Sequence, residues 1–352
     1  MEYNLSESGV HPLRLSEILT DPSDLSDHSL GYTQTNGTKE LREAIAATYP
    51  NADQDNILVT NGSSEAIFVV MWSFLERGAE VAVMLPNYMQ TWGLTKTFQA
   101  KLRPFWMRES KGAWVPDLQS LKKAVSRKTR LIAVCNPNNP TGAIMRDEQV
   151  QEICRIAKKA GAWILSDEVY HGAELDGKSS PSFWNRYEKV IVTNGLSKAY
   201  GMPGLRVGWV VAPSELVAKL WSYHDYTTIC PSALSDYLAR RVLTQDLRTK
   251  ILTRTKQILR ENLPVVRNWV ERHQRCLSFI PPEAGAIALV KYSLKISSSD
   301  LAERLVKEKS TLVVPGDQFL LGRYMRIGYG STGEYLKEGL NRVSEFINSI
   351  QS

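Results

Sequence analysis

The sequence has few cysteines and lacks the short motifs of several large enzyme classes. Its four cysteines show no CxxC spacing and lie mostly in apolar contexts, as expected of buried free thiols: Cys135, Cys154, Cys230 and Cys276. The zinc motif HExxH, the phosphate loop GxxxxGK(S/T) and the dinucleotide turn GxGxxG are all missing. We therefore predict no metal site, and the common metalloprotease, NTPase and dinucleotide-binding classes are excluded.

Long hydrophobic runs are missing as well. The longest apolar segments, such as IFVVMWSFL at residues 67–75, are too short to span a membrane and are typical of a buried helix. The first residues, MEYNLSESGV, lack the basic patch and apolar core of a signal peptide. We therefore expect a cytoplasmic protein that does not bind membranes.

The net charge of +6 does not gather in one place. Lysines and arginines occur singly or in pairs such as Lys158-Lys159. Proteins that bind nucleic acids concentrate such charges in a patch or stripe, whereas scattered charges are typical of a solvated surface. We expect no nucleic-acid partner.

Short apolar strands alternate with amphipathic helices through the middle of the chain. Helical patterns at 64–77 and 148–159 end at Gly78 and Gly161. Strand runs that are apolar throughout and separated by helices predict an α/β fold with a mainly parallel sheet covered on both faces. In such sheets ligands bind at the carboxyl ends of the strands. The expected strands are residues 57–60, 81–85, 131–135, 163–166, 190–193 and 207–211.

The chain of 352 residues is longer than one hydrophobic core usually serves. After about residue 250 the pattern changes to a long helix, then Pro281-Pro282, then a mixed segment that ends in an amphipathic helix at 333–350. We predict an N-terminal arm (1–30) that packs on the active site and the small domain, a large domain (31–250) and a small α+β C-terminal domain (251–352).

The segment NGLSKAYGMPGLRVGW at 194–209 carries the most informative chemistry. A predicted strand ends near Asn194, Lys198 follows at the turn, and Arg206 stands eight residues further on. A lysine in this place is positioned to form an imine with an aldehyde, and an arginine can hold a phosphate through two hydrogen bonds. A strand-end lysine by itself is more often simply exposed to solvent.

Four other segments fall at predicted strand ends. TNGSSEA places Gly62, Ser63 and Ser64 at a strand-to-helix junction, where free amides and the helix dipole favour an anion, although an ordinary serine N-cap would also explain it. PNYMQTW offers Tyr88, whose ring could stack on a flat cofactor or pack in the core. NPNNPTG, with Asn139, is a turn braced by two prolines.

The fourth segment is SDEVY at 166–170. Asp167 ends an apolar strand, where an unpaired carboxylate would be costly, and a protonated pyridine nitrogen would be a fitting partner. Tyr170, three residues further on, could then reach the neighbouring phenolic oxygen of the same ring.

Taken together and in their order along the chain, these motifs resemble the class I/II aminotransferases, a family of fold-type I enzymes that use pyridoxal phosphate (PLP). The resemblance runs from about Gly31 to Gly330. It implies a large domain with a mainly parallel sheet of the seven-stranded type. It also implies that Lys198 forms the Schiff base with PLP and shuttles protons, and that Asp167 pairs with the pyridinium nitrogen.

The resemblance assigns the remaining cofactor and substrate contacts as well. Asn139 and Tyr170 would bond the ring oxygen, with Asn139 also bordering the substrate, and Tyr88 would stack on the ring. Arg326, in YMRIGYG, would clamp the α-carboxylate of an amino-acid substrate. Tyr32, in LGYTQTNGTKELREAI, would reach the phosphate of the other subunit, which implies a homodimer with composite sites. The phosphate would be held by Gly62, Ser63, Ser64, Ser197 and Arg206.

Three features depart from the family pattern. Gly195 stands where the family usually has a serine that contacts the phosphate. Ala286, Ile287 and Ala288 replace bulky aromatic residues, which could leave room for a longer substrate. The arm, YNLSESGVHPLRLSEIL, differs from the glycine-rich opening of plain aminotransferases.

The arm and the short chain also resemble a divergent branch, the capreomycidine synthase-like and enduracididine-forming cyclases. These enzymes use PLP to expel a hydroxyl from a hydroxylated arginine and to close a ring with its guanidine. Glu7, Asp27 and His28 would be the natural partners of the guanidinium and the leaving hydroxyl. An exposed carboxylate in an arm explains Glu7 and Asp27 equally well. His11, His224 and His273 show no such context.

Two other hypotheses remain beside the cyclase. A conventional aminotransferase would use the same cofactor site with an amino donor and a 2-oxo acid acceptor. A non-catalytic regulator with this fold would need a helix-turn-helix domain, and the sequence shows none while it carries both Lys198 and Asp167.

Overall fold

The computed structural model describes residues 1–19 and 21–351. The large domain contains an eight-stranded sheet in the order β2-β9-β8-β7-β6-β3-β4-β5. In that order the strands are Ile57–Thr60, Gly208–Val211, Val190–Gly195, Trp163–Asp167, Thr129–Cys135, Glu80–Leu85, Lys101–Ser110 and Ala113–Pro116.

The sheet is mainly parallel, as predicted. The pairs β3–β4, β3–β6, β6–β7 and β7–β8 are parallel, whereas β9 runs antiparallel to both of its neighbours. The eighth strand, β5, was not expected: it folds back on β4 as an antiparallel hairpin and extends the sheet beyond the seven strands implied by the resemblance.

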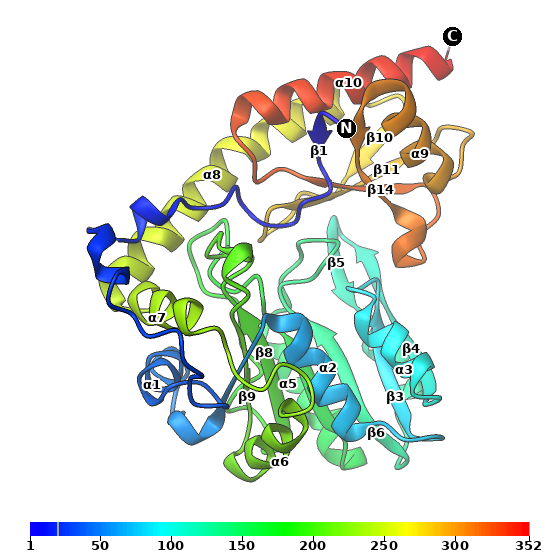
Figure 1. Cartoon of the computed structure of the whole chain (residues 1–352). Coiled ribbons are helices and arrows are strands. Elements are labelled where there is room, and N and C mark those ends of the chain that lie inside the picture. Colours follow the sequence, from blue (N-terminus) through cyan, green and yellow to red (C-terminus); the bar gives the residue numbers. More distant parts are fainter. Residues whose placement is uncertain (20, 352) are drawn as a thin grey trace.

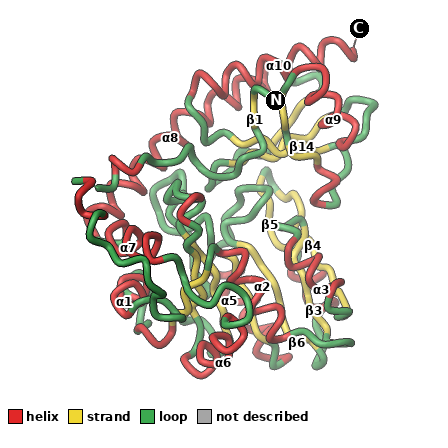
Figure 2. Tube along the Cα trace, in the orientation of Figure 1, coloured by secondary structure: helices red, strands yellow, loops and turns green. Residues whose placement is uncertain are grey.

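Helices cover both faces of this sheet, as Figure 2 shows. Alternate residues of a strand enter different cores: Ile132 and Val134 of β6 belong to one cluster, and Leu131 and Ala133 belong to the other. Burial on both faces explains why these strands read as continuous apolar runs. The helices of this domain are α1 (Lys39–Ala46), α2 (Ser63–Phe74), α3 (Gln90–Thr97), α4 (Leu118–Ala124), α5 (Asp147–Ala160), α6 (Ser214–His224) and α7 (Ala233–Val242).

A long helix, α8 (Gln245–Arg272), connects the two domains (Figure 1). The predicted boundary at 250/251 falls within this helix. The small domain has a four-stranded sheet in the order β10-β11-β14-β13. Its elements are β10 (Leu277–Phe279), β11 (Ile287–Tyr292), α9 (Ser298–Lys309), β13 (Val314–Pro315), β14 (Tyr324–Gly328) and α10 (Gly333–Gln351).

The N-terminal arm belongs structurally to the small domain at its start. β1 (Tyr3–Asn4) pairs in parallel with β12 (Thr311–Leu312), and the Gly328 amide donates to the Leu5 carbonyl at 2.7 Å. The arm then crosses to the large domain through short 3₁₀ turns at Leu15–Glu17 and Pro22–Leu25. Further 3₁₀ turns are Gln54–Asn56, Pro203–Leu205 and Gly316–Phe319. Within residues 1–19 and 21–351 no helix has the length and apolar character needed to cross a membrane.

Candidate active site

The carboxyl ends of β6, β7 and β8 meet at one edge of the sheet. Cys135 pairs in register with Asp167, and Asp167 pairs with Thr193. Lys198 follows the end of β8 by three residues and is half-buried. Because parallel strands end together, residues far apart in the sequence are brought to one place, as the motifs predicted.

Asp167 is a buried carboxyl group without a cationic partner in contact. Its Oδ1 accepts a hydrogen bond from the Val169 amide at 3.3 Å. Burial raises the pKa of Asp167 to about 7, and the charge of Lys198 opposes this only in part. A cation placed against this carboxylate would restore its ionised form.

Burial also affects the protonation of the Lys198 amine. It lowers the pKa of the Lys198 amine, while the negative charge of Glu7 acts in the opposite direction. A lysine with a lowered pKa holds more of its free amine, which is the form that condenses with an aldehyde.

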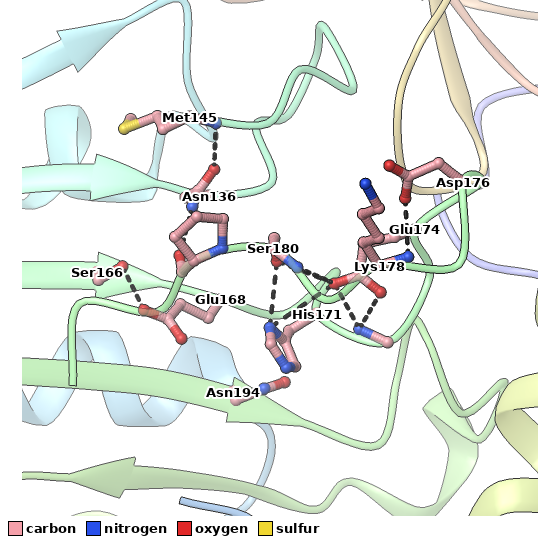
Figure 3. A network of polar contacts seen from close by, with 12 residues as sticks. Asn136, Met145, Ser166, Glu168, His171, Glu174, Asp176, Lys178, Ser180 and Asn194 are labelled. Carbon is pink, nitrogen blue, oxygen red and sulfur yellow. Dashed lines mark hydrogen bonds and ion pairs between the residues drawn. The ribbon is translucent and has the colours of Figure 1, made fainter. Parts of the chain in front are cut away.

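A polar network fixes the loop that follows Asp167 (Figure 3). The fully buried Glu174 accepts hydrogen bonds from the backbone amide and the hydroxyl of Ser180 at 3.0 and 2.9 Å. His171 Nδ1 lies 3.1 Å from the same hydroxyl. These bonds close the loop at 168–180 on itself. Tyr170, in the same loop, is buried.

The strand-to-helix junction from β2 to α2 forms a cup with Arg206. Two hydrogen bonds fix the guanidinium, one to the Asn61 carbonyl at 3.3 Å and one to the Pro203 carbonyl at 3.1 Å. Ser197 Oγ lies 3.5 Å from Arg206 Nη1. Gly62 has φ +90°, and a Cβ there would lie 2.2 Å from Arg206 Nη2, so only glycine leaves room for the arginine.

This cup is suited to a phosphate. Ser63 and Ser64 begin α2, so the first amides of that helix have no partner within the helix, and Arg206 adds a full positive charge. Gly195 packs on the backbone of β9: a Cβ at this position would lie 2.7 Å from the Val207 carbonyl oxygen. The close approach of the two strands therefore leaves room only for glycine at this position.

Arg326 extends from β14 toward the same edge of the sheet. Its Nη1 donates to Asn139 Oδ1 at 3.0 Å, and its Nη2 donates to the Ser6 carbonyl. The Phe319 ring lies 5.5 Å from the guanidinium carbon. The side chain is buried, yet its Nε has no hydrogen-bond partner among the described residues. A buried donor without a partner is costly, so a carboxylate from a ligand would fit at this position.

The arm supplies a wall of the site. A cavity of about 570 Å³ opens on the arm side of Lys198. Gly9 passes so close that a Cβ there would lie 3.1 Å from the Ser197 carbonyl oxygen. The Ser8 side chain lies next to the Tyr170 hydroxyl. Residues that line the cavity include Asn4, Glu7, Gly9, His11, Lys198 and Ser331.

Not all predicted residues gather here. His28 packs its ring on Tyr237 at 4.9 Å, and its Nε2 lies 3.2 Å from the Ala233 carbonyl oxygen, so its contacts are with α7. Asp27 is exposed to solvent. The roles of these two residues stay predictions. Tyr32 is 86% exposed, as a residue that serves another subunit would be.

Two further expectations concern space around the substrate. Tyr88 is 43% exposed and therefore open to stacking. Ala286 and Ala288 do not line the cavity beside Lys198: both are buried in the main core, because alternate residues of the β11 segment face inward. Ile287 packs with Tyr170 instead. The small residues thus explain core packing rather than room for a long side chain.

Sequence inspection missed three arm residues: Ser6, Ser8 and His11. Ser6 and Ser8 act through a carbonyl and a hydroxyl that any loop might offer, so no pattern marks them. His11 was set aside because nothing in the sequence places residue 11 beside residue 198. The run Ser6-Glu7-Ser8 before Gly9, in which hydroxyl and carboxylate side chains alternate, is the pattern that could have indicated an extended polar segment.

The site as a whole fits PLP. The cup at α2 can hold the phosphate of PLP, and the half-buried Lys198 can condense with its aldehyde. The carboxylate of Asp167 can pair with its pyridinium nitrogen. Arg326 leaves a donor free for the carboxylate of an amino acid.

Comparisons with known proteins agree with this site. Capreomycidine synthase from Streptomyces vinaceus is 31% identical, over 97% of this chain and 89% of that protein. Aspartate aminotransferase from Thermotoga maritima is 29% identical, over 90% of this chain and 84% of that protein.

Solved structures give the same result. A PLP-dependent aminotransferase from Streptococcus suis superimposes with a TM-score of 0.93 at 32% identity, covering 99% of this chain and 94% of that one. The PLP-dependent cyclase OrfR superimposes with a TM-score of 0.89 at 27% identity, covering 99% and 93%. The family model "Aminotransferase class I and II" matches residues 17–343. The chain therefore belongs to the class I and II aminotransferases, has the fold-type I architecture, and is a PLP-dependent enzyme.

Proposed function

We propose that this enzyme converts a hydroxylated L-arginine into a cyclic guanidino amino acid of the capreomycidine or enduracididine type. The observation that carries the proposal is the position of the arm, which brings the Glu7 carboxylate into the same cavity as Lys198. Similarity to capreomycidine synthase over 97% of the chain and to the cyclase OrfR over 99% supports the proposal.

Arg326 would bind the α-carboxylate of the substrate. Its Nε is free, its Nη1 is already oriented by Asn139, and the site is buried, so a charged hydrogen bond gains strength from the low dielectric. This anchors the substrate backbone and directs its side chain along the arm.

Lys198 and Asp167 would serve the reacting carbon. PLP, when bound, supplies an aldehyde for the amino group and a ring that withdraws electrons from the substrate. Asp167 would keep the ring nitrogen protonated, for which its own carboxyl must be ionised. Lys198, with its lowered pKa, would accept and return protons at the substrate carbons.

Glu7 would hold the guanidinium. Guanidine is so strong a base that it is bound as the guanidinium, which only donates hydrogen bonds. It therefore needs an acceptor carboxylate, and Glu7 lines the cavity. Overall, one C–N bond forms from the guanidine, one C–O bond breaks, and one water leaves. No oxidant and no second substrate is required.

A conventional aminotransferase is the second candidate. It is favoured by the close superposition on the Streptococcus suis aminotransferase, with a TM-score of 0.93. The cofactor residues would act identically, so only the acceptor and the products separate the two functions.

The test is to incubate the holoenzyme with arginine and hydroxyarginines, with and without 2-oxo acids, and to identify products by mass. The cyclase predicts a dehydrated, cyclic product from a hydroxyarginine without any 2-oxo acid. Turnover that requires a 2-oxo acid and returns a new amino acid from it would establish the aminotransferase and overturn the cyclase.

A further inference from the structure

The N-terminal arm is bonded to both domains as it crosses the active site. In the small domain, the Leu5 amide donates to the Leu312 carbonyl at 2.8 Å and the His11 amide donates to the Gly330 carbonyl at 2.7 Å. Two residues further on, the Leu13 amide donates to the Gly201 carbonyl of the large domain at 3.1 Å. The segment at 9–13 is therefore the place where the arm changes domain.

One side chain from α8 holds this crossing point. Arg254 donates from Nη1 and Nη2 to the His11 carbonyl at 3.2 Å each, and from Nη2 to His11 Nδ1 at 2.8 Å. Arg254 Nε lies 3.9 Å from Glu17 Oε1 further along the arm. The next residue of the helix, Thr255, donates to the Ala199 carbonyl at 2.7 Å, so the same turn of α8 holds the backbone next to Lys198.

We propose that Arg254 and His11 form an anchor that fixes the arm over Lys198, and that both are positioning residues for the substrate side of the cavity. Arg254 and His11 act on the cavity indirectly, through the arm backbone that their contact holds in place. Gly9, two residues before His11, lies against the backbone of Lys198, where a Cβ would be 3.5 Å from the Lys198 Cα. Glu7 lies two residues before Gly9 and lines the cavity.

The anchor requires a neutral histidine. Arginine has donors only, so His11 Nδ1 must accept, and the ring proton must then reside on Nε2. Protonation of Nδ1 would place two donors against each other and break this bond. The geometry therefore makes the hold on the arm sensitive to pH.

The charges around His11 favour the neutral form. Burial and the Arg254 guanidinium lower the pKa of His11 from its ordinary 6.5, and Glu17 of the arm opposes them. Glu7 and Lys198 border the same cavity. Because the docked arm lowers this pKa, the contact contributes fully above about pH 6.5 and is lost as the pH falls below it.

Amide hydrogen exchange of the holoenzyme, followed on arm peptides that contain His11 and Leu13, tests the proposal. We expect Arg254→Ala and His11→Ala to raise exchange there at least about tenfold at pH 8, because each variant loses at least one charge-assisted hydrogen bond. The rate at which hydroxylamine releases PLP should rise with it, because the arm then no longer covers Lys198. Arg267→Ala, an exposed arginine of the same helix, is the matched control.

His11→Asn separates an anchor from general packing. Its Oδ1 takes the place of Nδ1 and accepts from Arg254, but it does not titrate. We expect His11→Asn to keep arm protection at pH 8 and to retain it at about pH 5.5, where the wild-type arm loosens. Arm exchange in Arg254→Ala equal to that in Arg267→Ala, or the same loss of protection at low pH in His11→Asn as in the wild type, would overturn the proposal.

Discussion

The energetic cost of ionising Asp167 depends on whether a cation is bound next to its carboxylate. Burial raises its pKa to about 7 from 3.8, so in the apoprotein the ionised carboxylate destabilises the fold increasingly as the pH rises from about 4 to above 7. A pyridinium ring against the carboxylate would remove this cost.

We therefore predict that PLP raises the melting temperature of the apoprotein more at about pH 8 than at about pH 6, because Asp167 is ionised at the higher pH. Condensation at Lys198 also varies with pH, so Asp167→Asn, which keeps Lys198, is the control. The difference between the two pH values should shrink in this variant. An unchanged difference would show that Asp167 does not face the ring nitrogen.

Arg326→Lys is the residue-scale test of substrate binding. Lysine keeps the charge but cannot offer Nε and a second guanidinium nitrogen in one plane, so we expect the KM for the amino acid to rise at least about tenfold, with little change in PLP affinity. Steady-state kinetics and a PLP titration measure the two quantities. An unchanged KM would place the carboxylate anchor elsewhere.

At the scale of elements, the junction from β2 to α2 decides whether phosphate can bind. Gly62 and Gly78 share a positive φ, +90° and +87°, but only Gly62 faces Arg206, and a Cβ at Gly78 meets nothing within 4 Å. Replacing each glycine by alanine introduces the same backbone strain, about 1 kcal/mol.

We predict that Gly62→Ala displaces Arg206 and raises the dissociation constant of PLP at least about tenfold, whereas Gly78→Ala leaves it unchanged. Fluorescence titration of the apoproteins with PLP measures both. Equal dissociation constants in the two variants would mean that Arg206 does not contribute to the phosphate site.

Strands of the large sheet that are buried on both faces could be predicted from the sequence, and the exposed hairpin at one edge of the sheet could not. β2 matches its expected range and β6, β7 and β8 match theirs within two residues, because their apolar runs are continuous. The hairpin β4–β5 was missed: β4 contains Pro104 and lies next to the sheet edge, where its side chains are mostly solvent-accessible.

The same division holds for the site. The strand-end motifs marked Lys198, Asp167 and Arg206, because a polar residue at the end of a buried strand stands out in a sequence. The arm carries no comparable sequence pattern. Its position depends on a few hydrogen bonds to Gly201, Gly330 and Arg254, which lie far away in the sequence. His11 could be found only from the structure.

At the scale of the whole molecule, exposed aromatic and aliphatic side chains suggest a second subunit. Tyr32 is 86% exposed, Leu30 is 77% exposed and Tyr226 is 81% exposed. The segment with Tyr32 and the loop with Tyr226 lie together, since Thr33 donates to the Pro231 carbonyl at 2.9 Å. We propose that this surface is covered in a homodimer with composite sites.

Complementation between two inactive variants tests this arrangement. Lys198→Ala lacks the reactive amine, and Tyr32→Ala lacks the residue expected to serve the partner. If sites are shared, a mixed dimer contains one complete site, and an equal mixture after subunit exchange should regain about a quarter of wild-type activity. A mixture as inactive as its components, in dimers shown by sedimentation to have exchanged, would exclude shared sites.

The central claim is that Lys198 carries the cofactor, and one measurement tests it directly. The holoenzyme is reduced with borohydride, which makes the bond between PLP and its lysine permanent, and the digested protein is mapped by mass spectrometry. We predict a pyridoxyl group on the peptide that contains Lys198, and its absence in Lys198→Ala together with the loss of the yellow colour. A pyridoxyl group on another lysine, or full colour and turnover in Lys198→Ala, would contradict the account.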